Sequence, residues 1–143
     1  MKTISPALKF FLNLTMTQAV TARKFDATLS LHSISLSDFM MLFHLSGAPE
    51  QKLRRIDLAE KVGLSASAVT RKLLPLEKIG IVQRELHERD ARVSYVKLTD
   101  TGHRILFEAM ESAEMAASDF YLGDDKKLDT ATSVLIGLGG SIK

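Results

Sequence analysis

The segment from residue 53 to residue 102 most constrains this chain, because its helix and strand signals follow one another in a fixed order. It reads LRRIDLAEKVGLSASAVTRKLLPLEKIGIVQRELHERDARVSYVKLTDTG. Periodicity predicts a short helix at 56–62, a glycine turn, a second helix at 65–80 and two alternating strands at 81–86 and 93–98. This order is typical of a helix-turn-helix followed by a β-wing. In that arrangement the second helix fits a DNA major groove and the arginines of the wing tip reach the phosphates.

The second predicted helix carries different residues on its two faces. Ser65 is expected to cap its start. Apolar residues recur at the spacing of a stripe that faces the core: Ala66, Val69, Leu73 and Leu76. Polar residues fall on the opposite side: Ser67, Thr70, Arg71 and Lys78. Hydroxyls and an arginine near a helix N-terminus suit a helix that reads a groove, although the solvated face of an ordinary surface helix has the same pattern.

Pro75 interrupts the pattern inside this helix. A proline there clashes with the carbonyl of Arg71 and has no N–H to donate, which costs about 3 kcal/mol in a helix interior. The helix is therefore expected either to bend at Pro75 or to end there and restart before Gly80. Because the groove-reading end precedes the proline, we expect recognition to survive.

The predicted wing tip, residues 87–92, is charged and contains no glycine. Asp90 is the tip residue best able to adopt a left-handed conformation and to hydrogen-bond its own backbone. Its place two residues before Arg92 also allows a fork-to-fork pair that would aim the guanidinium. A solvated hairpin with an incidental ion pair is the alternative.

These features together resemble the MarR family of winged-helix transcription regulators. The matching segments are Leu36–Phe39, Leu58-Ala59, Leu64–Arg71, Leu76–Val82, Asp90-x-Arg92 and Val96-x-Leu98-Thr99-x-x-Gly102, within a similarity over about residues 30–105. The resemblance implies a homodimer on a pseudo-palindromic operator in double-stranded DNA. It makes one set of residues candidates for facing the groove: Ser65, Ser67, Thr70 and Arg71. It makes Arg89 and Arg92 the wing contacts, with Asp90 orienting the wing.

Composition fits a small DNA-binding protein. The 143 residues include no cysteine, which excludes disulfides, thiolate zinc sites and thiol switches. The net charge of +2 conceals an asymmetry, because residues 51–104 hold 12 Lys and Arg against 7 Asp and Glu, whereas residues 105–143 hold 3 against 7. The cations therefore lie on the segment that would meet phosphates. With no signal peptide and no apolar run that could span a bilayer, we expect a cytoplasmic protein with no membrane partner.

The two ends of the chain are expected to be helical and to form a dimer. Ser5-Pro6 begins a long helix to about Leu29, and a helix capped by Ser35 follows. Thr99 caps a helix to about Leu122, and a last helix runs from Asp124 to Leu138. The long C-terminal helix has a predicted inner face: Ile105, Leu106, Ala109, Met110, Ala113, Ala117 and Phe120. A lone winged helix does not need this many additional helices to cover its own core. A single-chain helical cap would also use them, but the family resemblance favours intertwined dimerisation helices.

The sequence thus predicts one domain over residues 1–143, mainly α with a small β-wing. A winged helix-turn-helix occupies residues 36–100, and long dimerisation helices flank it at 1–32 and 101–143.

Nothing in the sequence indicates catalysis, a metal site or a cofactor. The four histidines, His32, His44, His87 and His103, are scattered and show no ligand spacing. Several phenylalanines lie on helices that the family places around an effector cleft, although plain core packing is the alternative role: Phe10, Phe11, Phe25, Phe39, Phe43 and Phe107. A cleft lined by them would suit a hydrophobic or phenolic ligand.

The predicted function is a sequence-specific, dimeric DNA-binding transcription regulator and not an enzyme. We expect a repressor whose DNA binding is relieved by a small apolar or phenolic ligand. The alternative is a winged helix used as a protein-interaction or assembly module without specific DNA contact. The charged tip favours the regulator, because a protein-binding wing would more often carry apolar tip residues.

Overall fold

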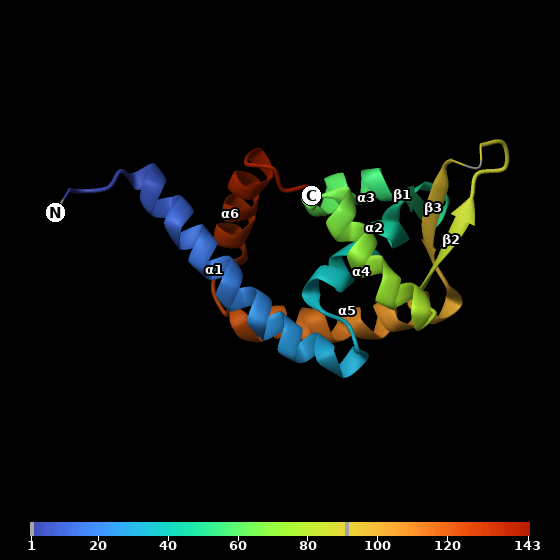
Figure 1. Ribbon diagram of the computed structural model, residues 1–143. Helices are drawn as coiled ribbons and strands as arrows, with labels where there is room; N and C mark the ends of the chain where they lie inside the picture. Colours follow the sequence, from blue (N-terminus) through green and yellow to red (C-terminus); the bar gives the residue numbers. More distant parts are fainter. Residues whose placement is uncertain (1, 91) are drawn as a thin grey trace.

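The computed structural model describes residues 2–90 and 92–143; Met1 and Ala91, the latter in the predicted wing tip, lie outside the described residues. The fold is mainly helical with one small antiparallel sheet, which confirms the predicted fold class (Figure 1). The elements occur in this order: α1 (Pro6–Leu29), η1 (Ser30–His32), α2 (Leu36–Gly47), η2 (Pro49–Gln51), β1 (Lys52–Arg54), α3 (Arg55–Val62), α4 (Ala66–Lys78), β2 (Val82–Leu86), β3 (Ser94–Leu98), α5 (Asp100–Phe120) and α6 (Asp125–Gly137). The wing lies at one end of the molecule, and the start of α1 lies at the other (Figure 1).

Capping side chains fix where the long helices begin. Ser5, Ser65 and Thr99 each accept a hydrogen bond from the backbone N–H three residues ahead, at 3.0–3.1 Å. Ser35 and Asp38 form a complete capping box at the start of α2. All of these starts were predicted, because a cap is a contact between residues close in sequence.

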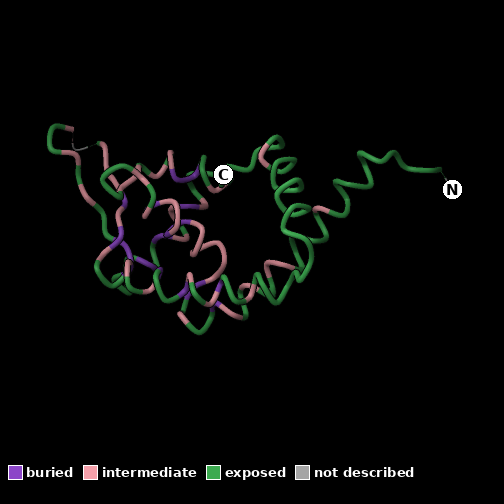
Figure 2. The backbone as a smooth tube through the Cα atoms, turned by 180° about the vertical axis from the view of Figure 1, so that it is seen from behind, coloured by how far each residue is buried: buried purple, intermediate pink, exposed green. Residues whose placement is uncertain are grey.

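The core lies beneath the helix-turn-helix, where α2, α3 and α4 meet the sheet and the first half of α5 (Figure 2). Its largest fully buried side chains come from the end of α1, from α2, α3 and α4, and from the turn after α4: Leu29, Met41, Leu42, Leu45, Leu58, Val69 and Ile81. The predicted core stripe of α4 is confirmed at Val69, Leu73 and Leu76, which are at most 5% exposed. The first half of α1 and all of α6 remain at the surface (Figure 2).

Three residues predicted to face the core are exposed instead: Ala66, Ala117 and Phe120. Ala66 is the first residue of α4, and it lines an open hollow beside the wing. Ala117 and Phe120 lie in the last turn of α5, where Ala117 lines an open apolar hollow and Phe120 stacks on Phe25 of α1 with 6.3 Å between ring centroids. Helical periodicity predicted the correct side of each helix, but only a neighbouring element buries a residue.

The sheet has three strands in the order β1-β3-β2, whereas the sequence predicted only two. β1 pairs antiparallel with β3, and Leu53 lies opposite Val96. β2 pairs with the other edge of β3 from Val82↔Leu98 to Leu86↔Ser94. β1 escaped prediction because a strand of three residues that is mainly basic shows no alternation.

α4 passes through Pro75 as one helix from Ala66 to Lys78, so the predicted alternative of an end and restart is wrong. Leu73 and Leu76, on either side of the proline in sequence, are both buried. Their burial offsets the lost backbone hydrogen bond. Gly80, with φ of 78°, then ends the helix in the left-handed conformation, and the N–H of Ile81 reaches back to the carbonyl of Leu76.

Thr99 and Gly102 join α5 to the end of the helix-turn-helix. The Thr99 hydroxyl contacts the carbonyl oxygens of Gly80 and Ile81, and its backbone N–H donates to Ile81 at 3.1 Å. Gly102 is buried against the same segment, and a Cβ at this position would overlap the Ile81 carbonyl oxygen. The Thr99-x-x-Gly102 spacing therefore has a physical reason: one residue caps and bonds, and the other permits close approach.

Replacing Gly102 with alanine should destabilise the protein, because the backbone at Ile81 must shift to admit the methyl group. We expect a loss of about 1–3 kcal/mol in the free energy of unfolding, measured by denaturant titration at fixed protein concentration. Gly47→Ala is the matched control, since a Cβ there meets nothing within 4 Å. Equal stability of the two variants would contradict the close approach.

Candidate nucleic-acid interface

An open hollow of about 640 Å³ separates the start of α4 from the wing. Its wall brings together four of the residues that the sequence singled out for DNA contact: Ser67, Thr70, Arg71 and Arg92. The remaining lining residues are ones that sequence reasoning did not assign to the site: Arg54, Arg55, Ile56, Ala66, Val93 and Ser94. Four arginines thus surround one concave surface, which suits a polyanion.

The turn between α3 and α4 positions the first wall of the hollow. Gly63 adopts a left-handed conformation with φ of 71°, as predicted, and the N–H of Leu64 bonds to the Ala59 carbonyl at 3.0 Å. Ser65 then caps α4, so its hydroxyl already accepts a backbone hydrogen bond. Ser67 and Arg71 are exposed on the first turns of α4.

The Thr70 side chain is already engaged within the chain. Its hydroxyl donates to the Ala66 carbonyl at 3.0 Å and accepts from the Arg55 guanidinium at 3.3 Å. This position differs from that of Ser67 and Arg71, whose side chains make no hydrogen bond within the described residues.

Arg54 and Arg55 are the main residues that sequence reasoning missed. Both lie at the start of α3, and Arg54 pairs with Asp57 at 3.4 Å. A sequence signal was available: cations at a helix N-terminus oppose the helix dipole. The helix dipole makes this position unfavourable for cations, so two consecutive arginines here indicate a role other than stabilising α3.

The wing tip holds Arg92 in the pair that its spacing predicted. Nε donates to Oδ1 of Asp90 at 3.1 Å and Nη2 to Oδ2 at 3.3 Å, and the Arg92 backbone N–H also donates to Oδ1. Hydrogen bonding to Arg92 lowers the pKa of the Asp90 carboxyl below its usual value, so the pair is charged at neutral pH. The Arg92 side chain is nevertheless 90% exposed, and its guanidinium is both aimed and accessible.

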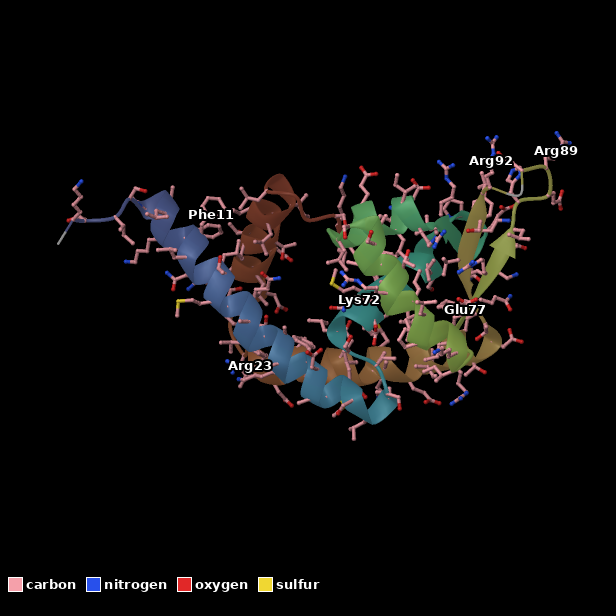
Figure 3. The ribbon with its side chains drawn as sticks, viewed as in Figure 1. Phe11, Arg23, Lys72, Glu77, Arg89 and Arg92 are labelled. Atoms are coloured by element: carbon pink, nitrogen blue, oxygen red, sulfur yellow. The ribbon has the colours of Figure 1, made fainter. Side chains whose placement is uncertain are left out.

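Asp90 does not adopt the left-handed conformation expected from the sequence; the described residues other than glycine that have positive φ are Ser33, Glu50 and Gln51. Side-chain acceptors build the turn instead. His87 Nδ1 accepts from the backbone N–H groups of Arg89 and Asp90, both at 3.1 Å. Arg89 is exposed beside Arg92 at the end of the hairpin (Figure 3).

Ion pairs on the outer face of the sheet hold the wing to the body. Lys52 of β1 reaches across β3 to Glu85 of β2 at 3.1 Å, and Lys97 lies 3.8 Å from the same carboxylate. The Lys52 ammonium also lies 4.8 Å from the centre of the Tyr95 ring. Hydrogen bonding to Lys52 lowers the pKa of Glu85, so these charges persist at neutral pH.

An apolar hollow of about 330 Å³ lies away from the wing. Three of the six phenylalanines proposed for an effector cleft line it: Phe25, Phe39 and Phe43. Phe10 and Phe11 lie on the exposed half of α1, and Phe107 is 79% exposed. Met110 and Ala113 of α5 complete the wall, with Glu114 as its one charged residue.

Within residues 2–90 and 92–143, no three His, Asp or Glu side chains converge in a way that could hold a metal ion. His32 lies 2.7 Å from the Ser112 hydroxyl, and burial lowers the pKa of His44. None of the helices in this part of the chain is both long and apolar enough to cross a membrane.

Comparisons with known proteins agree with this geometry. The MarR family model matches residues 34–94. The uncharacterised HTH-type transcriptional regulator YdgJ of Bacillus subtilis is 32% identical over 97 residues, which cover 68% of this chain and 54% of YdgJ. SarZ, an HTH-type transcriptional regulator of Staphylococcus haemolyticus, is 27% identical over 92% of this chain and 86% of its own. The chain belongs to the MarR family.

Solved MarR-family structures extend the likeness of fold to nearly the whole chain. A mutant of E. coli MarR complexed with operator DNA superposes with a TM-score of 0.83 at 19% identity, over 96% of this chain and 99% of that one. NadR in complex with 4-hydroxyphenylacetate gives a TM-score of 0.76 at 24% identity, over 97% and 98%. The alignment with YdgJ spans about half of that relative's length, whereas these superpositions include α1, α5 and α6.

We expect Asp90 to act on DNA binding only through Arg92. Asp90→Ala should weaken binding to a DNA duplex less than Arg92→Ala does, and the double variant should bind like Arg92→Ala alone, as measured by fluorescence anisotropy. Glu88→Gln controls for the removed negative charge, because Glu88 lies on the same exposed tip. Additive losses in the double variant would show that Asp90 does not act through Arg92.

Proposed function

We propose that this MarR-family protein is a homodimeric regulator, and not an enzyme, that binds a pseudo-palindromic operator. Each subunit would place α4 in a major groove and its wing along the backbone. The observation that carries the proposal is the hollow with four arginines between the exposed start of α4 and the wing. In this arrangement Ser67 and Arg71 face base edges, whereas Arg89 and Arg92 face phosphates.

The free surface of the terminal helices supports a dimer. α6 buries none of its residues, and α1 buries only Leu29. Large apolar side chains lie open along the first half of α1: Leu8 (47% exposed), Phe11 (46%), Leu12 (50%) and Met16 (67%). A second copy would cover these faces, since apolar surface gains about 25 cal/mol per Å² on burial. We propose that residues 1–32 and 101–143 form the dimer contact and residues 36–100 the DNA-binding unit.

We further propose that a small apolar or phenolic ligand relieves repression from the hollow lined by Phe25, Phe39 and Phe43. Its wall contains aromatic rings, methionine and a single carboxylate, which suits a mainly apolar molecule. The complex of NadR with 4-hydroxyphenylacetate supports this ligand class by likeness of fold.

Binding to operator DNA should depend steeply on salt. Genomic fragments selected with the purified protein provide the operator, and a random duplex of equal length is the reference. If a dimer neutralises about 6–10 phosphates, its affinity should fall by about 10³–10⁵ between 50 and 200 mM salt. A flat salt response, or equal affinity for both duplexes, would favour the protein-interaction module instead.

Two arginine variants should separate positioning from base reading. Arg92→Ala should weaken binding to both duplexes and lower the salt slope, because a backbone contact is independent of sequence. Arg71→Ala should cost about 1–3 kcal/mol chiefly on the selected fragment and relax the preference at one base pair. Identical profiles for the two variants would show that these roles are wrongly assigned.

The dimer should be obligate, so that folding and association are one event. The midpoint of thermal unfolding should rise with protein concentration, and sedimentation at micromolar concentration should show a species twice the 15.8 kDa chain mass. Phe11→Glu should disrupt the dimer, whereas Leu86→Glu should not, because Leu86 is 62% exposed on β2, outside the proposed dimer contact. A stable monomer that still folds would exclude the two-groove arrangement.

A further inference from the structure

Thr70 uses its only hydroxyl hydrogen within its own helix. The hydroxyl donates to the carbonyl of Ala66, one turn earlier, at 3.0 Å. In this arrangement Thr70 has no hydrogen left to offer to a base, and what remains is acceptor capacity. The Thr70 hydroxyl oxygen accepts a hydrogen bond from Arg55 Nη1 at 3.3 Å.

Arg55 is a cation in an unusual place. It is the first residue of α3, where the helix dipole opposes a positive charge, and it is half-buried against α4. Three other arginines near the interface have carboxylate partners, since Arg54 pairs with Asp57, Arg84 with Glu77 and Arg92 with Asp90, whereas the exposed Arg71 has none within the described residues. Within the described residues Arg55 pairs with no carboxylate and is held by the neutral Thr70 hydroxyl.

The position of Arg55 favours an external anion. The residue lines the open hollow between α4 and the wing, together with Arg54, Arg71 and Arg92. Arg55 therefore borders the space that the proposed function gives to a DNA strand, and it also lines a smaller hollow beside Glu77 and Arg84. A partly desolvated guanidinium without a carboxylate binds a phosphate more strongly than a neutralised one does.

We propose that Thr70 is a positioning residue that holds Arg55 against α4, so that its guanidinium contacts a backbone phosphate between α4 and the wing. This inference rests on the proposed DNA-binding function and changes one part of it. Thr70, expected from the sequence to face base edges, contributes affinity for any duplex through Arg55, and base reading falls to Ser67 and Arg71.

The experiment compares Thr70→Val, Thr70→Ser, Arg55→Gln and the double variant Thr70→Val/Arg55→Gln. Valine keeps the shape of the side chain and removes the hydroxyl, whereas serine keeps the hydroxyl. Each protein is titrated with a genomic fragment selected by the wild type and with a random duplex of equal length, over a range of salt. Thermal unfolding at one protein concentration verifies that each variant is folded.

We expect Thr70→Val to weaken binding to the selected fragment and to the random duplex by equal factors, of about tenfold, the larger end of the range for one lost hydrogen bond. Arg55→Gln should weaken binding to both duplexes at least as much. Arg55→Gln should also lower the salt slope by about 0.9 for each subunit, as expected for one phosphate contact. Thr70→Ser should bind like the wild type, and the double variant should be no weaker than Arg55→Gln alone.

Three results would overturn the positioning role while leaving DNA binding intact: a Thr70→Val loss confined to the selected fragment, wild-type binding by Thr70→Val, or additive losses in the double variant. The first would make Thr70 a base-reading residue. A wild-type protein that binds neither duplex would instead remove the proposed function, and this inference with it.

Discussion

The contact of Thr99 with the Gly80–Ile81 backbone is the interaction on which the rest of the molecule depends. One short segment ends α4, begins β2 and receives the cap of α5. Ile81 is only 1% exposed, so this junction is also part of the core. These contacts of Thr99 with the backbone therefore restrain the angle between α4 and the long α5. If α5 lies in the dimer interface, as proposed, the junction also sets the separation of two α4 helices, and with it the spacing of the DNA half-sites.

The arginines of the interface fall into two groups that act differently. Arg54 and Arg92 have carboxylate partners, and such exposed pairs contribute little to folding stability. The pairs would instead orient the guanidinium groups, because a side chain that is already held in place loses less conformational entropy when it binds a phosphate. Arg55 and Arg71 have no such partner within the described residues and provide uncompensated charge. If this surface binds DNA as proposed, affinity and register would come from separate sets of its side chains.

The sequence predicted those features that depend on neighbours along the chain. The caps at Ser5, Ser65 and Thr99 and the Asp90–Arg92 pair are contacts within a few residues, and each was found where expected. Features that depend on distant segments were missed. β1 exists only because β3 pairs with it, and the hollow with Arg55 forms only when the start of α3, the start of α4 and the wing come together. Periodicity likewise placed Phe120 on an inner face, but it could not show that a single helix, α1, would cover it there and leave it 36% exposed.

The placement of the apolar hollow restricts how a ligand could influence DNA binding. Phe39 and Phe43 lie on α2, which packs under the helix-turn-helix, whereas Met110 and Ala113 lie on α5. A ligand in the hollow would therefore contact both the DNA-binding part and the helix that we place in the dimer interface. Because the Thr99 contact joins α5 to the end of α4, a change in the distance between α2 and α5 would also move α4 relative to a partner subunit bound through α5. A ligand that fits the hollow equally well at both α2–α5 distances would not shift the equilibrium between them, however tightly it binds. The proposed relief of repression would therefore require a molecule that fills the hollow better at the α2–α5 distance that DNA binding disfavours.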